Sequence, residues 1–208
     1  MSESDLTRSI REMLGNRPVV FVGMMGSGKS AIGRMVADEL KLRFVDSDAE
    51  IVAAAGMSIP EIFEKFGEEH FRSGEKLVVH RLLAEGPLVL SLGGGAFIPQ
   101  ETRDEIASLG ISVWLKADID LLMSRVLRRP KARPLLQTPD PKATLADLLA
   151  RREPVYKLAD IHVESSRLSK RETRDDVLQA LHDWLGSHPI DDKPATAGEG
   201  ESLANRQG

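Results

Sequence analysis

The segment PVVFVGMMGSGKSAIG (residues 18–33) carries the strongest indication of the fold. Its segment GMMGSGKS, at 23–30, fits the phosphate-loop pattern G-x-x-x-x-G-K-[ST]. An apolar run typical of a strand precedes the loop, and apolar residues at helical spacing follow it, which is the context that this motif requires. The bare pattern arises by chance in about one chain in a hundred of this length, and the flanking elements make chance rarer still. The sequence therefore predicts a nucleotide-binding P-loop.

Each type of residue in this loop has a chemical task. Glycine allows the backbone to wrap an anion, so that successive N–H groups and the N-terminus of the following helix face the phosphates. We expect Lys29 to reach the β- and γ-phosphates of ATP and the Ser30 hydroxyl to bind Mg²⁺. The predicted phosphate-binding residues are Gly23, Gly26, Ser27, Gly28, Lys29, Ser30 and Ala31.

Short apolar runs alternate with amphipathic segments along the rest of the chain. This alternation predicts an α/β fold of the P-loop NTPase type, a three-layer parallel β-sheet flanked by helices. Ligands of such sheets bind at the carboxyl ends of the strands. The runs expected to form strands lie at 18–23, 43–48, 88–94, 112–117 and 159–165.

Length and composition limit the class of protein. The 208 residues fit one domain, and a net charge of −4 argues against nucleic acid or an anionic membrane as partner. No window approaches 18 consecutive apolar residues, so we expect no spanning helix and a cytoplasmic protein. The absence of cysteine excludes disulfides and cysteine nucleophiles. We expect a kinase domain at 17–186, preceded by an extension at 1–16 with a possible short helix and followed by a disordered tail at 187–208.

Two carboxylates follow the second expected strand, in the segment VDSDAEI. Asp46 and Asp48 bracket one residue, so their side chains share a direction if the strand continues through both. Beside a γ-phosphate, one carboxylate can hold Mg²⁺ through its water shell, and the other can accept a hydrogen bond and the proton of an attacking hydroxyl. The alternative is that an aspartate caps the helix that follows. For a pair beside a P-loop, we prefer the metal and acceptor roles.

These segments together resemble the shikimate kinases, a family of small P-loop kinases. The shared motifs are GMMGSGKSAIG, DSD, FRSGE, LSLGGGA and RPLL, in the family's order and spacing over roughly residues 19–165. The resemblance implies transfer of the γ-phosphoryl of MgATP to the 3-hydroxyl of shikimate. The products are shikimate 3-phosphate and ADP, in the biosynthesis of aromatic amino acids.

The resemblance also assigns roles on the acceptor side. By the family's pattern, Asp46 lies on the magnesium side with Ser30, and Asp48 binds the ring hydroxyls of shikimate as candidate base. A triplet of glycines has its backbone against the acceptor and the γ-phosphate, where a Cβ would occupy ligand space. In this chain the triplet is Gly93, Gly94 and Gly95.

Arginines complete the implied site. A guanidinium binds a carboxylate in a bidentate geometry that an ammonium cannot provide. The resemblance assigns the carboxylate of shikimate to Arg72 and Arg152. The neighbouring Arg151 competes with Arg152, which we prefer because of its distance from Tyr156.

Residues 128–142, with four prolines and five basic residues, predict a mobile lid loop rather than a regular helix. Closure of such a loop over the triphosphate would exclude water and bring an arginine to the transferring phosphoryl group. Arg133 matches the lid arginine of the family. Arg125 and Arg129 both remain candidates to flank the adenine.

Two other classes of protein compete with this interpretation. Gluconate kinase shares the phosphate loop and the lid, but the combination of DSD, FR and GGG speaks against it. A non-catalytic, ligand-sensing kinase-like module would carry an attached DNA-binding domain, and about 17 residues before the first expected strand are too few for one. We expect a monomer whose partners are the small molecules shikimate and ATP.

Overall fold

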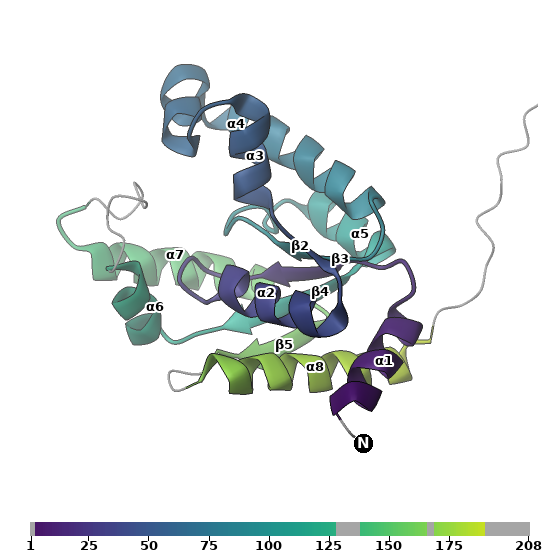
Figure 1. Ribbon diagram of the computed structural model, residues 1–208. Helices are drawn as coiled ribbons and strands as arrows, with labels where there is room; N and C mark the ends of the chain where they lie inside the picture. Colours follow the sequence, from purple (N-terminus) through teal and green to yellow (C-terminus); the bar gives the residue numbers. More distant parts are fainter. Residues whose placement is uncertain (1–2, 128–137, 166–168, 190–208) are drawn as a thin grey trace, which may run out of the picture.

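The computed structural model describes residues 3–127, 138–165 and 169–189 (Figure 1). Within these ranges five parallel strands form one sheet in the order β2-β3-β1-β4-β5. The predicted parallel α/β fold is confirmed, and each strand lies within or beside its expected run. The strands are β1 (Val19–Val22), β2 (Arg43–Asp46), β3 (Leu88–Ser91), β4 (Ile111–Lys116) and β5 (Ile161–Glu164).

Helices cover both faces of this sheet (Figure 1). The first face carries α1 (Glu3–Leu14), α2 (Lys29–Leu40) and α8 (Lys170–Ser187), whose apolar side chains share one core. The second face carries α4 (Ile59–Ala84), α5 (Gln100–Leu109), α6 (Ile119–Val126) and α7 (Pro141–Tyr156), which share another. The remaining helix, α3 (Ser47–Ala55), follows β2 and packs on α4. None of the helices in the described ranges is long and apolar enough to span a membrane.

The central strand β1 shows why the sheet needs both layers. Its side chains alternate between the faces, as the period of two in a strand requires. Val19 and Phe21 belong to the core under α1, α2 and α8, and Val20 and Val22 belong to the opposite core. All four are buried, as expected for a parallel strand covered on both sides.

The strand order also determines where a ligand can bind. From β1 the chain leads to β2 and β3 on one side of the sheet and to β4 and β5 on the other. Where the direction of the connections reverses, a crevice opens beyond the carboxyl ends of the strands. The P-loop follows β1 at this point.

The two ends of the described chain differ in their packing. Ile10 and Leu14 of α1 are buried, so the N-terminal helix is part of the core. Helix α8 continues to Ser187, and the rest of the predicted tail from residue 190 lies outside the described residues.

Candidate active site

The P-loop turns on three glycines with left-handed backbone. The φ angles are 132° at Gly23, 82° at Gly26 and 106° at Gly28, values that residues with a Cβ rarely adopt. Gly28 is also the N-cap of α2, so the positive end of the helix opens onto the loop. The buried Lys29 ammonium folds back over the loop and donates to the carbonyl oxygens of Gly23 (2.8 Å) and Met24 (2.9 Å). The Lys29 ammonium and the backbone amides of the loop together provide the positive charge and the hydrogen-bond donors that a phosphate group requires.

Three oxygen-bearing side chains meet where α2, β2 and β3 converge. The Ser30 hydroxyl donates to Asp46 Oδ2 at 2.7 Å and lies 3.2 Å from Ser91 Oγ. Hydroxyl and carboxylate oxygens are ligands that Mg²⁺ accepts, and it usually completes its shell with water and substrate phosphates. The described residues contain no cluster of three or more acidic, histidine or cysteine ligands. The three oxygen-bearing side chains therefore fit a magnesium ion that is shared with a nucleotide.

The expectation that the second strand continues through Asp48 is wrong. Strand β2 ends at Asp46, and α3 begins at Ser47. Asp46 is the N-cap of α3, because its Oδ1 accepts a hydrogen bond from the amide of Asp48 at 3.1 Å. Asp46 therefore caps the helix, as the alternative interpretation of the aspartates stated. Its other oxygen contacts Ser30 at the same time. Asp48 lies in the first turn of the helix instead of on the strand.

The glycine triplet lies against the side chains predicted to hold the acceptor. An added Cβ would lie 2.5 Å from Asp48 Oδ1 at Gly93, 3.3 Å from Arg152 Nη1 at Gly94, and 2.7 Å from Arg72 Nη1 at Gly95. None of the three has a positive φ. Their requirement for glycine is therefore one of space: each makes room for a different polar side chain of the site.

The two predicted arginines approach this turn from different helices. Arg72, on α4, donates to the buried Glu75 at 2.8 Å and to Glu68 at 3.2 Å. Burial raises the pKa of Glu75, the adjacent Arg72 guanidinium opposes this rise, and the nearby Asp48 adds to it. Arg152, on α7, donates from Nη1 to the Gly94 carbonyl oxygen at 3.0 Å.

Of the two adjacent arginines on α7, only one approaches the glycine turn. The Arg151 Nε donates to the carbonyl oxygen of Asp147, at 3.3 Å on its own helix, and the residue is exposed. The structure thus places Arg152, and not Arg151, at the glycine turn.

A cavity of about 360 Å³ extends from the phosphate loop to Asp48, Gly93 and Gly94. Arg125 lies at its other end, where Nη1 donates to the carbonyl oxygens of Gly26 (3.2 Å) and Ser27 (2.9 Å) and to Ser165 Oγ (3.0 Å). Of the two candidates for the adenine side, Arg125 thus lines the cavity. The other candidate, Arg129, lies outside the described residues, as do Arg133 and the 128–137 part of the predicted lid.

Several residues of the site were not predicted from the sequence. Glu75 stands three residues after Arg72 in FRSGE, a helical spacing that could have indicated the pair. Ser91 ends its strand at the same level as Asp46, its partner in the sheet register. The far end of the cavity had no local signal, because its lining comes from the residue that follows β5 and from α8. Those residues are Ser165, Lys170 and Thr173.

A parallel sheet with a P-loop after its central strand and a polar acceptor site beside it defines a small-molecule kinase of the P-loop class. The sequence profile of the family described as Shikimate kinase matches residues 25–182. The chain belongs to the shikimate kinase family, and it is an ATP-dependent kinase, a transferase.

Individual relatives agree with this family. A shikimate kinase of Rhodopseudomonas palustris is 52% identical over 176 residues, 85% of this chain and 86% of that protein. One of Bradyrhizobium diazoefficiens is 52% identical over 186 residues, 89% of each chain. The solved structure of a shikimate kinase from Acinetobacter baumannii, in complex with shikimate, matches with a TM-score of 0.77 at 37% identity. That match covers 82% of this chain and 95% of the other. The family predicted from the motifs is confirmed, and the gluconate kinase alternative is set aside.

Proposed function

We propose that this enzyme transfers the γ-phosphoryl of MgATP to the 3-hydroxyl of shikimate, giving shikimate 3-phosphate and ADP. The observation that carries the proposal is the position of Asp46. One of its oxygens contacts Ser30 of the P-loop, and the other binds the amide of Asp48. The nucleotide side and the acceptor side of the cavity are therefore neighbours across a single residue, as a direct transfer requires.

The phosphate side supplies the positive charge for the transfer. Lys29 and the loop amides hold the β- and γ-phosphates. Ser30 and Asp46 would hold Mg²⁺, which when bound neutralises charge on the β- and γ-oxygens. Arg133, outside the described residues, is proposed to add its charge from the lid. Arg125 is proposed to lie beside the adenine.

The acceptor side orients the attacking hydroxyl. Arg72 and Arg152 bind the carboxylate of shikimate from two sides of the glycine turn, and the bidentate geometry of guanidinium fixes the ring. Glu75 holds Arg72 in place. Asp48 then accepts a hydrogen bond from the 3-hydroxyl and takes its proton as the phosphoryl group transfers. Most of the rate enhancement comes from position and electrostatics.

The proposal also covers the domain bounds, the oligomeric state and the cellular compartment. The kinase domain is 17–186, with 1–16 as an N-terminal extension and 187–208 as a tail outside the catalytic unit. The enzyme acts as a monomer. Its compartment is the cytoplasm.

Identification of the product tests the reaction. The enzyme is incubated with MgATP and shikimate, and the phosphorylated oxygen is assigned by ¹H–³¹P correlation. We expect shikimate 3-phosphate, and no phosphorylated product when gluconate replaces shikimate. A phosphoryl group on another hydroxyl, or product from gluconate alone, would contradict the proposal.

A further inference from the structure

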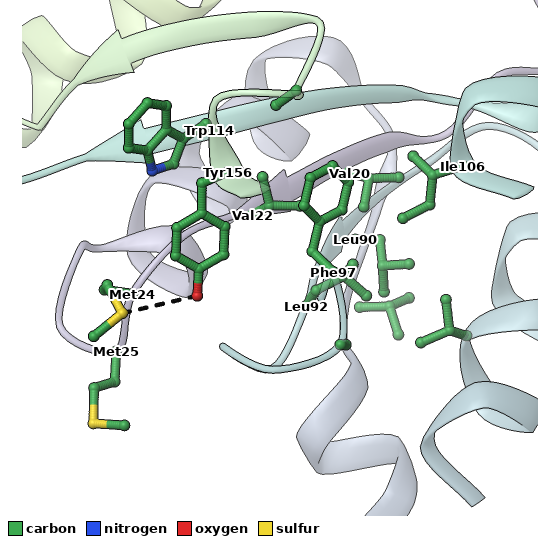
Figure 2. Packing of buried hydrophobic residues seen from close by; sticks show 14 of the residues in the cluster. Val20, Val22, Met24, Met25, Leu90, Leu92, Phe97, Ile106, Trp114 and Tyr156 are labelled. Carbon is green, nitrogen blue, oxygen red and sulfur yellow. Dashed lines mark hydrogen bonds between the residues drawn. The ribbon is translucent and has the colours of Figure 1, made fainter. Parts of the chain in front are cut away.

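Tyr156 is the last residue of α7 and is fully buried beside the glycine turn. Figure 2 shows its ring between Trp114 and Met24, with the hydroxyl pointing toward Met24 Sδ, 3.8 Å away. The same hydroxyl donates a hydrogen bond to the carbonyl oxygen of Gly94. One buried hydroxyl therefore contacts both the P-loop, at Met24, and the central glycine of the triplet.

Arg152 uses the same acceptor atom. It precedes Tyr156 by four residues, so the two side chains lie on one face of α7. Its Nη1 donates to the Gly94 carbonyl oxygen at 3.0 Å. A carbonyl oxygen has two lone pairs, and these two donors occupy both. The guanidinium and the phenol thus meet at one atom, so each restrains the other.

The space around Gly94 makes this restraint strict. A Cβ at Gly94 would lie 3.3 Å from Arg152 Nη1 and 3.7 Å from both Gly23 O and Met25 N. The turn is thus packed between Arg152 and the P-loop. Without the Tyr156 hydroxyl, the Gly94 carbonyl would lose one of these two donors, and the guanidinium would lose orientation that carboxylate binding needs.

We propose that Tyr156 is a positioning residue for the acceptor, whose hydroxyl holds the Arg152 guanidinium through the shared Gly94 carbonyl. The inference rests on the proposed role of Arg152 in binding the carboxylate of shikimate. The ring of Tyr156 packs near Trp114, with centroids 6.2 Å apart, whatever the hydroxyl does. The hydroxyl alone is therefore the group to test.

Tyr156→Phe removes the hydroxyl and keeps the ring. We expect the KM for shikimate to rise about tenfold, the effect of one buried hydrogen bond, while the KM for ATP stays unchanged. The matched control is Leu145→Val, which truncates another fully buried residue of α7 at a distance from the turn. This control should lower the melting temperature without changing the KM for shikimate. If Tyr156 had a purely structural role, Tyr156→Phe would lower the melting temperature and leave the KM for shikimate unchanged, as the control does. This result would overturn the proposal.

A double-mutant cycle separates this inference from the proposed function. Arg152→Ala alone should raise the KM for shikimate, and if it does not, the proposed role of Arg152 fails together with the inference. If it does, adding Tyr156→Phe to Arg152→Ala should cause no further rise, because the hydroxyl acts through the arginine. Additive effects would overturn the role of Tyr156 and leave that of Arg152 intact.

A spectroscopic test does not depend on the folding of Tyr156→Phe. Tyr156 is the sole tyrosine of the chain, so incorporation of 3-fluorotyrosine labels this position alone. We expect its ¹⁹F resonance to shift when shikimate is added to the labelled enzyme, and to shift much less in labelled Arg152→Ala at shikimate concentrations that still saturate it. An unchanged resonance in the labelled enzyme would contradict the proposal.

Discussion

Asp46 uses its two carboxylate oxygens for different purposes. Oδ1 caps α3 by accepting a hydrogen bond from the amide of Asp48, and Oδ2 accepts a hydrogen bond from the Ser30 hydroxyl. Because an N-cap has a fixed rotamer relative to its helix, the start of α3 also fixes the oxygen that faces the P-loop. The helix cap and the proposed metal-side carboxylate are thus compatible in one residue.

Glu75 is a buried carboxyl group whose pKa is changed by its surroundings. Burial raises its pKa above the ordinary glutamate value of 4.5, against the opposing effect of Arg72. A folded pKa above the unfolded value means that the folded state binds the proton more tightly. This contribution to stability is present below the unfolded pKa and is lost as the pH rises through the folded pKa.

The variant Glu75→Gln has no proton to lose. We expect the free energy of unfolding of the wild type to fall relative to that of Glu75→Gln as the pH rises above 4.5. Urea unfolding at a series of pH values measures the difference. The control is Glu68→Gln, which removes an exposed partner of the same arginine and keeps Glu75, so the fall in stability with rising pH should remain. Parallel curves for the wild type and Glu75→Gln would show that the pKa of Glu75 is not raised.

At the scale of single elements, α4 is two helical segments joined at Gly67. The backbone there has φ 80° and ψ 175°, a region that is essentially restricted to glycine. The segment before the kink packs on α3 through Ile62, and the segment after it carries Arg72 and Glu75 to the glycine turn. The kink therefore determines the direction from which Arg72 enters the site.

Gly67→Ala should lower the free energy of unfolding by about 1 to 3 kcal/mol, because alanine is strained at these angles. The matched control, Gly74→Ala, changes a glycine of the same helix that has no positive φ. An added Cβ meets nothing within 4 Å at either position. The control should raise stability by roughly 0.5 to 1 kcal/mol. Urea unfolding of both variants checks this, and equal effects would show that Gly67 does not determine the kink.

Elements were predictable from the sequence where their signal is local. The P-loop, its strand and its helix follow from one motif. The end of β2 was not predictable, because in DSD either aspartate can extend the strand or cap the helix. Leu77 fits the apolar pattern of α4 and is nevertheless 70% exposed, since the pattern does not say which face meets the sheet. Thr173 reaches the cavity only through the packing of α8, which no local pattern encodes.

At the scale of the whole molecule, the fold is a sheet between two separate cores. The core under α1, α2 and α8 packs on one face of β1, the strand that leads into the P-loop. The other core contains residues that flank the glycine turn, together with residues of α7. Helix α1 lies at the far end of the first core from the site. Its buried residues should therefore affect stability and leave substrate binding unchanged.

Ile10→Ala should lower the free energy of unfolding by about 2 to 5 kcal/mol, because Ile10 is fully buried. The control Leu77→Ala truncates a side chain that is 70% exposed and should change stability by less than about 0.5 kcal/mol. Denaturant unfolding measures both. A small loss for Ile10→Ala would mean that α1 is not part of the cooperative core.

In the proposed reaction one cavity holds two substrates, with Asp48 on the acceptor side and outside the nucleotide site. The most direct test compares kcat and the Kd for MgATP in the wild type and in Asp48→Asn, with the exposed Asp176→Asn as control. We predict that Asp48→Asn lowers kcat by about 100-fold or more, because the proton acceptor is lost, and leaves the Kd for MgATP within about twofold. Asp176→Asn should match the wild type in both quantities. Equal losses of turnover and of nucleotide affinity in Asp48→Asn, or turnover at the wild-type rate, would show that Asp48 is not the proton acceptor on the acceptor side.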